Sequence, residues 1–231
     1  MLYIVATPIG NLDDMSPRGV QVFRDVDVIA CEDTRRTWAL LSHFNIPRPA
    51  SFISYRQGNE LSVGRKLVSM LESGREVALC SDGGFPGISD PGYRLICLAI
   101  KHNIEIRVIP GASSVIVALL SSGLSTSSFT FKGYPPRKSG AMKKFFKEEE
   151  NNPHTLIIFE SSLRVRNTLK VALDVYGNRK VAVCSELTKK FERVLRGYLY
   201  DLCNAEHHNI QKGEVTIVIA GNNSKFSRDL P

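Results

Sequence analysis

The sequence lacks paired cysteines and long apolar runs. Its five cysteines are widely spaced and form no C-x-x-C pair, which argues against disulfides and structural zinc. No stretch approaches the ~20 apolar residues that cross a bilayer, and the N-terminus is too short and uncharged for a secretory signal. We therefore expect a cytoplasmic protein without a metal or a membrane contact, whose thiols are mostly buried. The cysteines are Cys31, Cys80, Cys97, Cys184 and Cys203.

Common nucleotide-binding and catalytic motifs are also absent. The first turn, Thr7–Leu12, follows an apolar run where a dinucleotide fold would carry G-x-G-x-x-G, but that fingerprint is missing. The sequence has no Walker lysine, no H-E-x-x-H and no G-x-S-x-G. These absences argue against nicotinamide enzymes, P-loop proteins, zinc peptidases and α/β-hydrolases.

The most informative stretch is the apolar run 76–80 followed by the glycine- and proline-rich loop 81–92. The run predicts a buried strand, and a loop with little Cβ bulk lets a ligand approach the backbone. In open α/β sheets ligands lie beyond the carboxyl ends of strands. The alternative is a plain connection in which Gly and Pro only terminate the strand.

The pattern of apolar and amphipathic segments predicts an α/β protein of two domains, 1–124 and 125–231, joined near the serine-rich segment 121–128. The first half predicts a mainly parallel sheet, and the close strands around 180–197 imply antiparallel pairing in the second. The expected strands are 2–6, 26–30, 76–80, 106–109, 129–133, 155–160, 180–185, 192–197 and 214–220. The expected helices are 17–23, 37–44, 60–71, 93–101, 113–121, 142–150, 163–176 and 199–207.

Positive charge is concentrated in the second half. Residues 1–124 carry twelve Lys and Arg and twelve Asp and Glu, whereas residues 125–231 carry eighteen and eleven. Within the second half, the basic run 132–147 is typical of a surface that binds nucleic-acid phosphates. Alternatively, this run is part of a solvated helix face whose charge Glu148–Glu150 neutralise. The cations that we predict to contact RNA are Arg35, Arg56, Lys132, Arg137, Lys138, Lys143, Lys144, Lys147 and Arg193. Tyr134 or Phe131 could stack on a base, but a place in the core or at its edge is the commoner role for both.

Two further loops follow expected strands at the same edge of the first sheet. Pro110–Ser114 offers serines that could cap a helix or bind a ligand, and Glu32–Arg35 could form an ion network or the polar wall of a site. Together with the first turn and the loop 81–92, these loops contain no lysine. They suit a neutral or cationic small ligand.

The sequence resembles the tetrapyrrole-methylase superfamily of S-adenosylmethionine-dependent methyltransferases. Within that superfamily it is similar to the branch that 2′-O-methylates a cytidine of small-subunit ribosomal RNA. The resemblance covers about residues 2–221 and depends on the order and spacing of short motifs. These motifs are Thr7–Leu12, Glu32–Arg35, Ser81–Asp82 with Pro86 and Ile88–Gly92, Pro110–Gly111, Glu160–Ser161 with Arg164, Glu186–Lys189 with Glu192, and Lys212–Glu214.

The resemblance implies two α/β domains with S-adenosylmethionine in the cleft between them, a homodimer, and small-subunit ribosomal RNA or the assembled subunit as partner. By the same resemblance, the residues that line the cofactor site are Pro8, Ser81, Asp82, Gly83, Gly84, Phe85, Ile88, Ser113, Ser114, Phe159 and Leu187. The chain departs from the family at Gly83 and Phe85, where Ala and Thr are usual. It also has Tyr55–Glu60 in place of a histidine-containing stretch, and Ser162–Leu163 in place of Pro-His.

A base or a cation is expected to help the ribose hydroxyl lose its proton. The candidates are Asp33, Asp82, Glu186, Lys189 and Glu192, of which Asp82 and Glu186 could equally be structural. Two other functions stay open. One is methylation of a small, tetrapyrrole-like molecule, and the other is RNA binding by an assembly factor that has lost its cofactor site.

Overall fold

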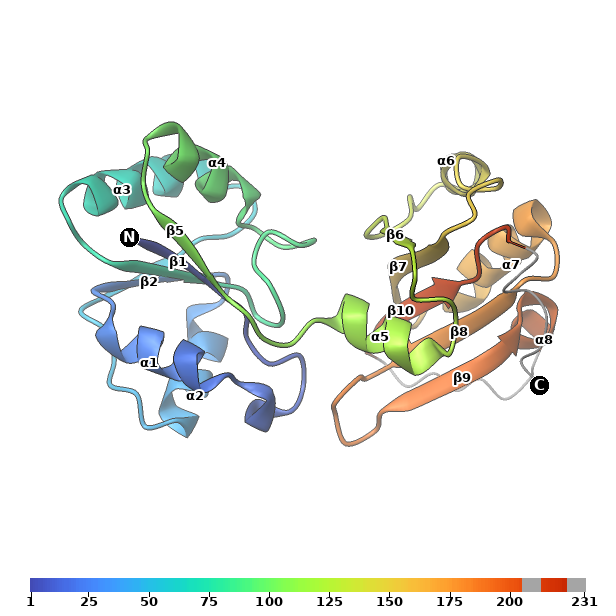
Figure 1. Cartoon of the computed structure of the whole chain (residues 1–231), viewed down its shortest axis with the longest axis horizontal. Helices are drawn as coiled ribbons and strands as arrows, with labels where there is room; N and C mark the ends of the chain where they lie inside the picture. The colour runs from blue at the N-terminus through green and yellow to red at the C-terminus, as the bar shows by residue number, and fades with distance from the viewer. Residues whose placement is uncertain (205–212, 224–231) are drawn as a thin grey trace. The chain divides into compact units, whose positions relative to one another are not determined.

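The computed structural model describes residues 1–204 and 213–223 and contains two sheets of five strands. Contacts divide the chain into two compact α/β units, Met1–Ser113 and Ser114–Pro231 (Figure 1). The predicted fold class, two α/β domains, is confirmed. The predicted end of the last helix, 205–207, and Lys212 of the last motif lie outside the described residues.

The first unit is built on a parallel sheet with strand order β3-β2-β4-β1-β5. Every residue of β2 and β4 is buried, as expected for central strands covered on both faces. The strands are β1 (Leu2–Val5), β2 (Val28–Cys31), β3 (Ser51–Ser54), β4 (Val77–Cys80) and β5 (Ile106–Ile109).

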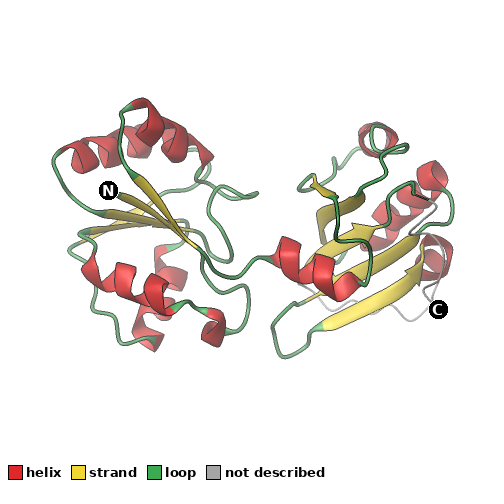
Figure 2. Ribbon diagram, in the orientation of Figure 1, coloured by secondary structure: helices red, strands yellow, loops and turns green. Residues whose placement is uncertain are grey.

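Helices cover both faces of this sheet, as Figure 2 shows. One core joins Phe23 of α1 and Leu41 of α2 to Ile29 of the sheet. A second core, on the other face, joins α3 and α4 to alternate strand residues such as Leu79. The helices are the short 3-10 turn η1 (Leu12–Asp14), α1 (Pro17–Asp25), α2 (Thr34–His43), α3 (Glu60–Glu72) and α4 (Tyr93–Lys101).

The second unit has a mixed sheet with strand order β6-β7-β10-β8-β9. Strands β6 and β7 pair in parallel, the other neighbouring strands that the structure describes pair antiparallel, and the predicted antiparallel pairing near 180–197 is confirmed between β8 and β9. The strands are β6 (Phe129–Phe131), β7 (Thr155–Ser161), β8 (Lys180–Ser185), β9 (Arg193–Tyr198) and β10 (Glu214–Ile219).

The larger core of this unit joins residues of α6 (Ser139–Lys147), α7 (Val165–Tyr176) and α8 (Leu199–Asn204), such as Phe146 and Leu169, to strand residues such as Ile217. Helix α5 (Ser114–Ser122) packs on β8 and β10. The Cys184 thiol lies 3.9 Å from the carbonyl oxygen of Ala118 in α5. Because α5 joins the second sheet, the units divide earlier in the chain than the predicted boundary at Leu124.

Candidate functional site

The loop after β4 lies where the first sheet changes its direction of winding. Both neighbours of β4 lead to helices on one face, since β1 is followed by α1 and β2 by α2. Strand β4 instead leads to α4 on the opposite face (Figure 1). The loop 81–92 therefore diverges from the loops on both sides of it. In doubly wound sheets such a switch point is where ligands bind.

Hydrogen bonds join the loops after β1 and β4. The amides of Thr7 and Gly84 each donate to the other's carbonyl oxygen at 2.9 Å. The Thr7 hydroxyl donates to the Ser81 carbonyl at 3.1 Å, and the Ser81 hydroxyl donates to the Gly84 carbonyl at 3.3 Å. Because these groups are buried, the start of the loop is fixed before any ligand binds.

Some glycines of this loop are required by its geometry. Gly84 has a φ of 83°, in the region that side chains disfavour. A Cβ at Gly92 would lie 2.6 Å from the Gly87 nitrogen, which is a clash, whereas a Cβ at Gly83 would lie 3.4 Å from the carbonyl oxygen of Pro8, an ordinary contact. The low bulk predicted from the sequence thus brings stretches of backbone together, and at Gly92 it leaves no room for a side chain between them.

Asp82 ties this loop to the loop after β2. Its Oδ1 accepts a hydrogen bond from the Asp33 amide at 3.1 Å, and its Oδ2 pairs with Nη1 of Arg36 at 3.3 Å. Asp33 accepts three hydrogen bonds from Arg35, and these hold the pKa of the Asp33 carboxyl well below its usual range. Asp33 and Arg35 of the segment Glu32–Arg35 therefore form part of an ion network. The sequence allowed either such a network or the polar wall of a site.

Glu32 differs from these two acids. Its side chain is half-buried, and burial, followed by the nearby charge of Asp82, raises the pKa of its carboxyl. No hydrogen bond or ion pair to this carboxylate is present in the described part of the chain. The sequence interpretation included Glu32 in a motif but did not select it, although its place directly after a buried strand was the available signal.

The other predicted cofactor residues fall in both units. In the first unit Pro8 is buried, Phe85 and Ser113 are half-buried, and Ile88 is half-exposed. In the second unit, Ser114 begins α5, Phe159 lies in β7 and Leu187 is buried after β8. The role of each in cofactor binding stays a prediction.

The predicted catalytic residues of the second unit hold the turn between β8 and β9. Oε1 of Glu186 accepts from the Lys189 ammonium at 3.1 Å and from the Glu214 amide at 3.2 Å. The Glu192 carboxylate accepts from the Thr188 amide at 2.6 Å. Glu186 and Thr188 have positive φ angles of 51° and 63°. These side-chain bonds stabilise a turn whose backbone is otherwise unfavourable.

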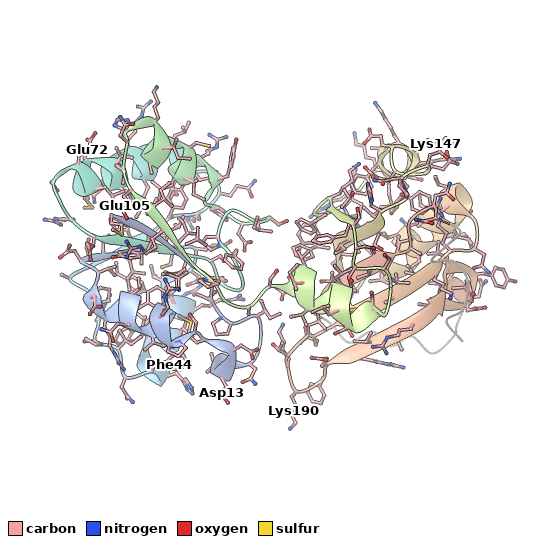
Figure 3. All side chains as sticks on the ribbon, viewed as in Figure 1. Asp13, Phe44, Glu72, Glu105, Lys147 and Lys190 are labelled. Carbon is pink, nitrogen blue, oxygen red and sulfur yellow. The ribbon has the colours of Figure 1, made fainter. Side chains whose placement is uncertain are left out.

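The basic run 132–147 divides into paired and unpaired cations. Lys132 pairs with Glu148 at 3.0 Å and with Glu149 at 3.2 Å, and Lys147, labelled in Figure 3, pairs with Glu150. The neutralisation that we considered from the sequence is therefore real for these two lysines. Of the remaining cations, those that are exposed and form no ion pair with another described residue are Arg137, Lys138, Lys143 and Lys144, together with Arg56 and Arg193. Arg35 is exposed but pairs with Asp33.

A buried acid in the second unit belonged to a motif of the family resemblance but was not selected as a site residue. Glu160 is 1 % exposed and accepts hydrogen bonds from the Thr168 hydroxyl at 2.7 Å and from the Ser161 amide at 2.8 Å. Nη2 of Arg164 lies 3.3 Å from the same carboxylate and also donates to the carbonyls of Pro135 and Pro136, each at 3.1 Å. A glutamate that ends an apolar strand, with an arginine four residues later, was the signal available in the sequence.

Within residues 1–204 and 213–223, no helix combines the length and apolar character that a membrane span needs. The same residues contain no group of three or more His, Cys, Asp or Glu side chains arranged to hold a metal ion.

The chain is similar to known proteins in sequence and in structure. Residues 1–203 match the family model described as Tetrapyrrole (Corrin/Porphyrin) Methylases. Ribosomal RNA small subunit methyltransferase I of Halalkalibacterium halodurans is 43 % identical over 224 residues, which cover 97 % of this chain and 77 % of that protein. The protein of the same name from Hydrogenobaculum sp. is 40 % identical over 231 residues and 99 % of each chain.

Solved structures agree on the fold at low identity. The methyltransferase CobJ superposes with a TM-score of 0.71 at 15 % identity, covering 96 % of this chain and 94 % of that one. Uroporphyrin-III C-methyl transferase from Thermus thermophilus, complexed with S-adenyl homocysteine, superposes with a TM-score of 0.65 at 16 % identity, covering 94 % and 96 %.

Proposed function

The chain belongs to the tetrapyrrole methylase family, and we propose that it transfers a methyl group from S-adenosylmethionine to the 2′-hydroxyl of a cytidine in small-subunit ribosomal RNA. The observation that carries the proposal is the 40–43 % identity, over nearly the whole chain, to proteins named ribosomal RNA small subunit methyltransferase I. The structures at 15–16 % identity support only the fold.

The residues at the carboxyl edge of the first sheet fit this cofactor. Gly83 and Gly84 keep the backbone open to close approach, and a Cβ at Gly83 would already be in contact with the first turn. The carboxylates of Glu32 and Asp82 lie at the same edge and suit a ligand that carries a positive sulfonium. Bound S-adenosylmethionine supplies an electrophilic methyl group. We assign its binding to Pro8, Ser81–Phe85, Ile88 and Ser113 of this unit, with Ser114, Phe159 and Leu187 of the second unit.

Alignment of the ribose hydroxyl with the methyl group is the main task of the protein. Holding reacting atoms ~3–3.5 Å apart can remove on the order of 7–11 kcal/mol from a barrier. The proton of the hydroxyl needs an acceptor whose pKa is not far below neutrality. Asp33 is poorly suited, because the hydrogen bonds from Arg35 stabilise its charged form. Glu32, whose pKa is raised, is better suited and joins Asp82, Glu186, Lys189 and Glu192 as a candidate.

The RNA is held, in this proposal, by the cations that form no ion pair with another described residue. Arg137, Lys138, Lys143 and Lys144 lie within eight residues of one another in the sequence, and exposed cations of this kind bind phosphates without reading sequence. We further propose that the protein acts as a homodimer in the cytoplasm, where its ribosomal substrate is found.

Two measurements separate this function from its alternatives. A saturating dose of S-adenosylmethionine at ~100 times its dissociation constant should stabilise the protein by ~2.7 kcal/mol, which a thermal melt detects. An assembly factor without a cofactor site would show no shift. Purified protein with methyl-labelled cofactor should then label small ribosomal subunits from a strain that lacks the enzyme. Label on an added tetrapyrrole, with none on the subunits, would support the small-molecule alternative.

A further inference from the structure

Tyr134 presents an exposed aromatic ring directly after β6. It is 56 % exposed, yet its ring packs edge-to-face on Phe159 with the ring centres 5.6 Å apart. Phe159 in turn packs against Phe131 at 4.8 Å. The ring of Tyr134 is therefore supported by Phe159, which packs in turn against Phe131, while much of the Tyr134 surface stays open to solvent.

The backbone on both sides of Tyr134 is fixed. Before it, the Lys132 amide donates to the Ile157 carbonyl at 3.1 Å, and the Gly133 carbonyl accepts from the Phe159 amide at 3.0 Å. After it, the carbonyls of Pro135 and Pro136 accept from Arg164, which Glu160 holds from the buried side. A ring held in this way loses little conformational freedom when a planar ligand stacks on it.

The unpaired cations begin three residues after Tyr134. At ~3.6 Å of extended chain per residue, the Cα atom of Arg137 lies at most ~11 Å from that of Tyr134. Lys138 follows, and Lys143 and Lys144 are exposed on α6, which begins at Ser139. An exposed ring beside phosphate-binding cations is the combination by which proteins bind unpaired nucleotides, whose bases are free to stack.

We propose that Tyr134 is a stacking platform for an unpaired nucleotide of the RNA substrate, with Arg137, Lys138, Lys143 and Lys144 on the adjoining phosphates. This inference rests on the proposed function and adds the site at which the protein distinguishes single-stranded from paired RNA. Paired RNA reaches the cations only, because its bases are stacked on one another. Single-stranded RNA uses both the cations and the ring.

The test is a fluorescence-anisotropy titration of a ten-nucleotide single-stranded RNA and of the same RNA as a duplex, at several salt concentrations. Tyr134→Ala should weaken single-strand binding about tenfold, leave duplex binding unchanged, and leave the slope of log Kd against log salt unchanged. Tyr134→Phe should bind as the wild type does. The double variant Lys143→Glu/Lys144→Glu should instead reduce that slope by about 1.4, since each phosphate contact on a single strand contributes ~0.7.

Tyr200 on α8 provides a matched control, because it is 59 % exposed and lies on another element. Tyr200→Ala should leave both affinities unchanged. With small ribosomal subunits as substrate, Tyr134→Ala should raise KM about tenfold and leave kcat and cofactor affinity within twofold. If Tyr134→Ala binds single strands and uses subunits as the wild type does, the platform is refuted while the proposed function stands. If the wild type does not methylate subunits at all, the proposed function itself fails.

A second readout follows the ring directly. The chain has a single tryptophan, Trp38, so the variant Trp38→Phe/Tyr134→Trp carries one reporter at the platform. Single-stranded RNA should quench its fluorescence, and the duplex should not. Equal quenching by both RNAs would contradict stacking.

Discussion

Replacement of Asp82 separates a structural from a chemical role at the switch point of the first sheet. Asp82 is 21 % exposed at its side chain and holds the loop after β2 through the Asp33 amide, at 3.1 Å, and through Arg36, at 3.3 Å. A hydrogen bond to a charged acceptor contributes about 1.5–3 kcal/mol. The ion pair adds less than 1 kcal/mol, because the Arg36 side chain is 69 % exposed.

Asp82→Ala removes both contacts and should lower the free energy of unfolding by about 2 kcal/mol. For a chain of this size that is roughly 4–8 °C in Tm. Asp82→Asn keeps an oxygen that accepts from the Asp33 amide, so it should lose about 1 kcal/mol or less. Arg36→Gln is the matched control, since it removes the ion pair alone and should cost less than 1 kcal/mol.

The assay compares Tm, cofactor affinity by calorimetry and the rate of methyl transfer to small ribosomal subunits. If Asp82 acts by holding the loops together, the alanine variant loses cofactor affinity, whereas the asparagine variant keeps cofactor affinity and kcat within about tenfold of wild type. An asparagine variant with normal Tm and cofactor affinity but a kcat reduced more than a hundredfold would refute this reasoning, because it would make the carboxylate itself part of the chemistry.

Three other outcomes are expected. Arg164→Ala leaves the Glu160 carboxylate buried without its cation and should cost about 2–4 kcal/mol in chemical denaturation, and Arg164→Lys should recover part of that loss. Gly92→Ala should abolish cofactor binding because its Cβ would overlap backbone, while Gly74→Ala, at a φ of 87° with open space around it, should cost only about 1–2 kcal/mol and spare the site. In the native protein at pH 8, Ellman's reagent should modify Cys97, the exposed thiol; burial raises the pKa of Cys31 and of Cys184 to about 11, so their thiolates form only as the pH rises toward that value, and rapid reaction of either at pH 8 would contradict the packing.

Much of the fold followed from apolar periodicity. The run 76–80 became β4 and 180–185 matches β8, because buried strands are nearly continuous apolar segments. The segment 106–109 matches β5, an edge strand of which Arg107 and Val108 are exposed. Strand β3 was missed, since its four residues are all half-buried and begin and end with serine. Its pairing with β2 is a tertiary contact that local sequence does not record.

The candidate site was predictable in outline and less so in its contacts. The loop 81–92 was identified from its glycines, but its hydrogen bonds to Thr7 and to Asp33 join segments more than 45 residues apart in the sequence. The split of the basic run into paired and unpaired lysines depends on which side chains Glu148–Glu150 reach in space. Arg164 gained its role only when folding brought the carbonyls of Pro135 and Pro136 beside it.

The most direct test of the central claim is to map the methyl group after reaction of the purified protein with methyl-labelled S-adenosylmethionine and small ribosomal subunits that lack the modification. The account predicts one label per subunit, on the 2′-oxygen of a cytidine ribose, and no label when Gly92→Ala replaces the wild type. Label on a base, or unlabelled subunits with a protein that binds the cofactor, would contradict it.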